Sequence, residues 1–145
     1  MAEDDRHYEP DHSGMYELEF PGPQLSSADG RGPVLVHALE GFSDAGHAVK
    51  LAAAHLRDSL DTELVASFAI DDLLDYRSRR PTMTFKTDRF TAYEDPQLGL
   101  YALHDSVGTP FLLLAGMEPD LKWERFVTAV RLLAERLGVR RTIGL

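Results

Sequence analysis

Two apolar runs constrain the fold of this chain more than any other feature: residues 33–39 (PVLVHAL) and 110–115 (PFLLLA). Each run has the length of a strand, and apolar residues follow one another instead of alternating with polar ones. A strand with this pattern is buried on both faces, which is typical of central strands in parallel sheets that helices cover. The runs therefore indicate an α/β protein.

Two amphipathic helical patterns supply that cover. Apolar residues recur at helical spacing on one face between residues 45 and 60; they are Ala45, Val49, Ala52, Ala53, Leu56 and Leu60. Asp44 or Ser43 can cap this helix by accepting hydrogen bonds from its first backbone N–H groups. A second helix is expected over residues 121–137, with Gly138 ending it.

Shorter segments complete the expected sheet. Residues 63–70 are predicted to be the second strand of a right-handed βαβ unit, and residues 15–20 (MYELEF) alternate as an edge strand does. The remaining elements are a short helix at 71–76 and antiparallel strands at 82–85, 90–93 and 98–104. Residues 139–145 then begin a strand at which the sequence stops.

The fold class expected is a three-layer α/β arrangement, a mostly parallel sheet with helices on both faces. Two full helices and one short helix are too few to cover both faces of a sheet with four or more central strands. The last strand also lacks a following loop, where open α/β sheets place their ligands. We therefore expect the unit to be incomplete on its C-terminal side, where further chain or a partner subunit would complete it.

The negative charge is concentrated at the N-terminus. Residues 1–30 hold eight acidic residues and one basic residue, which gives −7 of the total −9. We expect residues 1–14 to be an acidic, disordered arm and residues 15–145 to be a single α/β domain. An acidic arm repels nucleic acid and anionic membranes, so neither is an expected partner; docking to a basic protein is the alternative role.

Other compositional features point to the cytoplasm. The chain has no cysteine, which fits a reducing compartment and excludes disulfides and thiolate metal sites. Its start lacks the basic and apolar regions of a secretory signal, and no apolar run approaches the roughly 20 residues of a membrane span.

The turn at residues 41–46 (GFSDAG) has the glycine spacing of a phosphate-binding loop. However, His47 and Ala48 replace the required Lys-Ser/Thr pair, and Asp44 would repel an anion. A tight strand-to-helix turn is favoured, and a recognition loop is the alternative. Ser43, Asp44 and His47 could form a catalytic group only with an oxyanion donor, which the sequence does not indicate.

The remaining polar clusters are expected to have structural roles and not catalytic or metal-binding ones. The six histidines have no metal-ligand spacing, so no metal or cofactor is expected. Arg77, Arg79 and Arg80 form a basic turn whose guanidinium groups are expected to pair with local carboxylates; the candidates are Asp71, Asp72 and Asp75. Trp123, after Glu118-Pro119, is expected to pack the second helix on the sheet or to anchor a protein interface.

Four fragments in a fixed order resemble a known family. They are GFSDAG at 41–46, DLLDYRSRRP at 72–81, LLLAGMEPDLKWERF at 112–126 and LAERLGVRRTIGL at 133–145. The set is similar to the family of the second proteasome assembly chaperone, in its actinobacterial branch, over residues 33–145. The resemblance implies an α/β fold akin to nucleoside phosphorylases, with a sheet that continues through a C-terminal portion.

The resemblance also implies candidate site residues. The positions that match recurrent ones of the family are Gly41, Phe42, Asp44, Gly46, Tyr76, Arg80, Pro81, Glu118, Pro119 and Trp123. Phe42 departs from the family, which usually carries Trp there. The eukaryotic members help to pair α-subunits of the proteasome ring, so proteasome-related subunits are candidate partners.

Two functional hypotheses follow. The first is a non-enzymatic, assembly-chaperone-like protein that works as a homo-oligomer and binds proteins through the loops at 40–44 and 116–120, with Phe42 and Trp123 as anchors. The second is an enzyme or small-ligand binder on a phosphorylase-like scaffold. The second hypothesis requires the side chains of Asp44, Arg80 and Glu118 to converge in one pocket.

Overall fold

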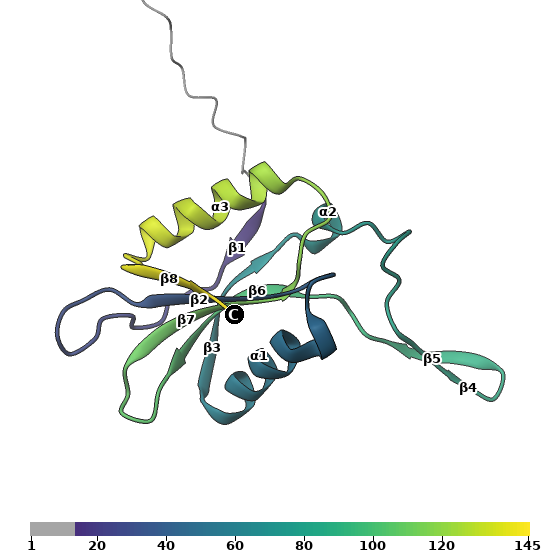
Figure 1. Ribbon diagram of the computed structural model, residues 1–145, viewed down its shortest axis with the longest axis horizontal. Coiled ribbons are helices and arrows are strands. Elements are labelled where there is room, and N and C mark those ends of the chain that lie inside the picture. The colour runs from purple at the N-terminus through teal and green to yellow at the C-terminus, as the bar shows by residue number, and fades with distance from the viewer. Residues whose placement is uncertain (1–13) are drawn as a thin grey trace, which may run out of the picture.

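The computed structural model describes residues 14–145, and its central element is a six-stranded sheet in the order β1-β3-β6-β7-β2-β8 (Figure 1). The strands are β1 (Tyr16–Leu18), β2 (Val34–Glu40), β3 (Asp61–Phe68), β6 (Leu98–His104), β7 (Pro110–Met117) and β8 (Arg141–Gly144). Both apolar runs are central strands, β2 and β7, and the alternating segment forms the edge strand β1, as predicted. The predicted acidic arm lies outside the described residues except for Gly14.

The sheet is mixed, which corrects the prediction of mostly parallel pairing. β2 pairs in parallel with β7 and β8, whereas the pairs β1/β3, β3/β6 and β6/β7 are antiparallel. The short turn between β6 and β7 imposes antiparallel pairing, because only a long crossover can join parallel neighbours. In this turn the Asp105 carboxylate accepts hydrogen bonds from the backbone N–H groups of Val107 and Thr109, at 3.0 and 2.8 Å.

One long helix covers each face of the sheet (Figure 1). α1 (Ala48–Ser59) packs through Ala53 on a cluster that includes Leu113, and α3 (Trp123–Arg136) packs through Phe126 on a cluster that includes Leu112. Leu112 and Leu113 are neighbours in β7, so alternate side chains of one strand enter opposite clusters. This explains why the central strands are apolar without alternation.

The first helix begins later than the sequence pattern predicts. Residues Ala45–His47 form a 3₁₀ turn, η1, in which Gly46 and His47 have positive φ angles of 65° and 59°. Ala52 is exposed, contrary to its predicted place on the buried face. Alanine is small enough to occupy either face of a helix, so its spacing carries little information. Gly138, with φ of 68°, closes α3 as predicted.

Strands β4 (Met83–Lys86) and β5 (Arg89–Tyr93) form a separate antiparallel hairpin, preceded by the short helix α2 (Ile70–Leu73). The hairpin projects away from the sheet (Figure 1), and every residue of its two strands is exposed. We call it the arm. No helix in the described part of the chain is both long enough and apolar enough to cross a bilayer.

Candidate functional site

The loop after β2 carries the most exposed aromatic side chain, Phe42, which is fully accessible to solvent. Its neighbour Asp44 has a structural role: its carboxylate oxygens accept hydrogen bonds from the backbone N–H groups of Val49 (2.8 Å) and Lys50 (3.2 Å). Asp44 therefore caps α1, as one of the two predicted alternatives, and its carboxylate occupies two of the free N–H groups at the start of this helix.

Glu118 lies directly against the loop after β2, because β2 and β7 are neighbours in the sheet. A Cβ atom added to Gly41 would lie 1.7 Å from Glu118 Oε2, so glycine leaves the space that this carboxylate occupies. The backbone N–H of Glu118 donates to the Glu40 carbonyl at 2.9 Å. The loops at 40–44 and 116–120 are thus adjacent, as the first hypothesis requires.

A clasp made by Arg79 and Asp120 joins the segment after α2 to the loop after β7. Their side chains form an ion pair at 2.8 Å, and both are less than a quarter exposed. Asp120 also accepts from the backbone N–H of Asp75 at 3.0 Å, and Arg79 donates to the Glu118 carbonyl at 3.0 Å. The prediction that the basic turn pairs with local carboxylates is therefore wrong for Arg79, whose partner lies 41 residues away.

Three other predicted site residues differ in how far they are buried and in what they contact. Pro119 is fully buried beside the clasp and is not part of an exposed surface. Tyr76 donates a hydrogen bond to Asp71 at 2.5 Å, and this bond raises the pKa of the tyrosine to about 12. Trp123 packs edge-on against Phe126, with ring centroids 5.9 Å apart, yet it remains 42% exposed. The packing of Trp123 on a core residue of its own helix is thus shown, and its role as an interface anchor stays a prediction.

The arm has one apolar face and one polar face. Directly opposed residues of two antiparallel strands lie on the same face, and the large side chains oppose one another as Met83–Tyr93 and Phe85–Phe90. The two phenylalanine rings are in contact, with centroids 5.1 Å apart. All four of these side chains are between 51% and 62% exposed. The arm therefore presents an open apolar surface.

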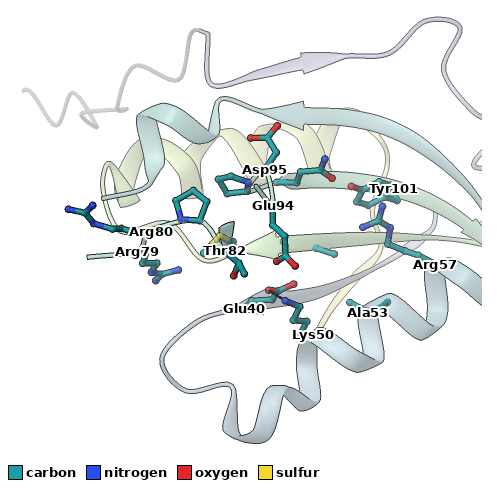
Figure 2. A pocket seen from close by; sticks show the side chains of 17 residues that line it. Glu40, Lys50, Ala53, Arg57, Arg79, Arg80, Thr82, Glu94, Asp95 and Tyr101 are labelled. Carbon is teal, nitrogen blue, oxygen red and sulfur yellow. Dashed lines mark ion pairs between the residues drawn. The ribbon is translucent and has the colours of Figure 1, made fainter. Parts of the chain in front are cut away.

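A cavity of about 380 Å³ lies at the root of the arm (Figure 2). Its walls come from the end of β2, one side of α1, both legs of the arm (residues 79–82 and 94–97), the middle of β6 and the end of β7. Tyr101 lines it, and the guanidinium of Arg57 lies 4.1 Å from the centroid of the tyrosine ring. Lys50 and Glu40 form a long ion pair at 3.9 Å.

The enzyme hypothesis requires Asp44, Arg80 and Glu118 to converge, and they do not. Arg80 lines the cavity, whereas Asp44 and Glu118 are absent from its walls. Asp44 is also committed to capping α1. Among residues 14–145, no group of three or more histidine or acidic side chains is placed to bind a metal ion.

The family of the chain follows from a comparison with family models. The model described as the PAC2 family matches residues 38–145, which is most of the chain. The chain belongs to the PAC2 family. This confirms the resemblance drawn from the four sequence fragments. A search of curated proteins gives no match to this PAC2 chain.

Solved structures from actinobacteria share this PAC2 fold. The Mycobacterium tuberculosis protein Rv2714, described as of unknown function, is 83% identical with a TM-score of 0.89, over 96% of this chain and 47% of that one. A Corynebacterium glutamicum protein of unknown function is 47% identical with a TM-score of 0.84, over 92% and 49% of the two chains. The M. tuberculosis proteasome-assembly chaperone homologue Rv2125 is 24% identical with a TM-score of 0.66, over 77% and 48%, which shows a shared fold. The present chain thus spans about half the length of the structures it matches.

Sequence reasoning missed two features of this PAC2 chain. The apolar face of the arm was detectable only in part, because Met83 and Phe85 alternate in the first predicted strand, whereas Phe90 and Tyr93 are three residues apart and share a face only through a register shift. The cavity was not detectable, since its walls come from segments far apart in the sequence. Arg57, Glu94 and Tyr101 belong to no motif that would have brought them together.

Proposed function

We propose that this PAC2 chain is a non-enzymatic, protein-binding protein with an assembly-chaperone-like role, and that it works as a homo-oligomer in the cytoplasm. The proposed unit is the single domain of residues 15–145. The observation that carries the proposal is the placement of exposed aromatic side chains on two projecting features, the loop after β2 and the arm. Aromatic residues on a surface are the favoured anchors of protein interfaces.

The arm supports self-association. A two-stranded hairpin is marginally stable alone in water and needs a further strand or packing against its apolar face. Its three aromatic side chains are 58–62% exposed, which leaves on the order of 350 Å² of ring surface open. A patch of this size is comparable to the largest apolar patch of a typical monomer, which is often functional. Burial of this face against another copy of the chain would stabilise the arm in an oligomer.

The oligomer is tested by the mass of the protein in solution. Replacing both Phe85 and Phe90 by threonine keeps residues that favour strands but removes the aromatic surface. We expect this variant to elute as a monomer of 16.2 kDa in light scattering, and the wild type to elute as a larger species. The matched control replaces Lys86 and Arg89, which form the opposed pair on the other face, by threonine and should leave the larger species intact.

The partner we propose for the loop after β2 is a subunit of the proteasome ring. Membership of the PAC2 family and the shared fold with the chaperone homologue Rv2125 support this choice. Phe42 is the proposed anchor, with Trp123 as a second contact. The test is binding of the purified proteasome α-subunit from the same organism to immobilised protein. Phe42→Ser should weaken binding at least tenfold without changing stability, since a buried aromatic anchor contributes about 2 kcal/mol or more. Equal binding by Phe42→Ser, or no binding by the wild type, would contradict the proposal.

A further inference from the structure

We infer that the arm of one copy of the chain inserts into an apolar groove between α3 and β8 of another copy, an inference that rests on the homo-oligomer proposed above and names the surface that receives the arm. Each copy would donate one arm and accept one arm. Copies joined head to tail in this way close into a ring or continue as a filament, because the two sides of the contact are different surfaces.

The groove lies along one flank of α3 and has a volume of about 630 Å³. Its floor is the sheet, and its other side is formed by β8. The apolar side chains that line it are Leu35, Leu39 and Leu114 on the floor and Trp123, Val127 and Val130 on the helix. Trp123 and Val127 are 42% and 53% exposed. The groove is therefore a second open apolar surface besides the arm.

Strand β8, beside the groove, has one open edge. It pairs with β2 and with no other strand of residues 14–145. In the same range, β4 and β5 pair only with each other, so each of them also has an open edge. Open edges of this kind pair with added strands. A hairpin added beside β8 would turn one face toward the flank of α3, and the apolar face of the arm suits that position.

The distribution of charge favours a head-to-tail contact. Residues 121–145, which form α3 and β8, hold six basic and two acidic residues and so carry +4. Residues 14–120, which include the arm, hold eight basic and 17 acidic residues and so carry −9. Two grooves that face each other would bring like charges together, whereas a head-to-tail contact places the basic end of one copy against the acidic body of the next.

A contact between two arms is the alternative, and it buries less apolar surface. A stable interface buries roughly 800 Å² on each partner, whereas the rings of one arm present only on the order of 350 Å². Two arms in contact would also leave the groove of both copies open. The arm projects away from α3 and β8 of its own chain (Figure 1). In a head-to-tail assembly, each copy buries both its arm and its groove.

A mixing experiment tests which surface receives the arm. Val127→Glu places a charge in the groove, and a glutamate four residues before Arg131 favours the helix, so α3 is retained. Replacing Phe85 and Phe90 by threonine removes the aromatic surface of the arm. We expect each variant alone to be a monomer of 16.2 kDa in light scattering. Their equimolar mixture should form a dimer of twice that mass, because the intact arm of the groove variant enters the intact groove of the arm variant.

The matched control is Leu51→Glu, which changes a leucine that is 64% exposed on α1, the helix on the opposite face of the sheet. This control should associate as the wild type does. Val127→Gln, a milder change in the groove, should weaken self-association about tenfold and serves if Val127→Glu does not fold. Groove variants that associate like the wild type, or a mixture that stays monomeric, would overturn the inference and leave the homo-oligomer standing. A monomeric wild type would overturn the homo-oligomer and the inference together.

Discussion

Removal of the Asp120 side chain should destabilise the fold strongly, although the residue lies in a loop. Asp120→Ala deletes the ion pair with Arg79 at 2.8 Å and the hydrogen bond from the Asp75 backbone at 3.0 Å. Hydrogen bonds to charged groups contribute about 1.5–3 kcal/mol each. The two side chains are 24% and 19% exposed, so the low end applies, and the expected loss is about 3 kcal/mol.

Urea unfolding measures this loss and separates the pair from its surroundings. Arg79→Ala should cost about 3 kcal/mol as well, because it also loses the bond to the Glu118 carbonyl. The double variant should cost less than the sum of the two single variants by about 1.5 kcal/mol, which is the coupling expected for residues in contact.

A second ion pair on the surface provides the control. Arg131 and Glu135 approach as closely, at 2.9 Å, but their side chains are 53% and 62% exposed. Glu135→Ala should therefore cost less than about 0.5 kcal/mol. If Asp120→Ala costs no more than Glu135→Ala, or if the double-mutant coupling is zero, the clasp does not hold the two loops together.

Three further substitutions test other parts of the structure. Asp44→Ala should cost about 1 kcal/mol in urea unfolding because α1 loses its cap, whereas Ser43→Ala, which removes no cap hydrogen bond, should be neutral. The hydrogen bond to an aspartate raises the pKa of Tyr76 from 10.0 to about 12. This bond therefore stabilises the fold below pH 10 and is lost as the pH rises toward 12. In urea unfolding, the wild type should be more stable than Tyr76→Phe below pH 10, and this difference should shrink between pH 10 and pH 12. Gly116→Ala should reduce stability by at least about 3 kcal/mol, with loss of soluble protein, because φ is 134° and the new Cβ would lie 2.1 Å from a backbone carbonyl oxygen.

The sequence was most informative about burial and least informative about pairing. Apolar runs without alternation located β2 and β7, and the pattern that ends at Gly138 located α3. The antiparallel direction of residues 98–104 was predicted, but the order of the strands was not accessible, because a strand buried on both faces can take any central position in the sheet. β6 is such a strand, and it separates β3 from β7 in the sheet.

In the candidate site, a contact between residues close in the sequence was predicted and a contact between distant residues was not. Asp44 was correctly expected to cap α1, because a cap is set by residues adjacent in the sequence. The partner of Arg79 was missed, because three nearer carboxylates were available in the sequence and tertiary packing selected Asp120. Charge pairs between loops depend on the finished topology, which local patterns do not encode.

The position of β2 in the sheet has a consequence for biosynthesis. Both neighbours of β2 come from late in the sequence, since β7 spans Pro110–Met117 and β8 spans Arg141–Gly144. At about 5–20 residues per second, a ribosome needs several seconds between completing β2 and completing β7. During that time the nascent chain carries an apolar strand with two open edges, the kind of segment that aggregates or recruits a holdase. Folding should accordingly be slow, because it depends on contacts between residues far apart in the sequence. The central sheet should form only after β7 has left the exit tunnel and can pair with β2.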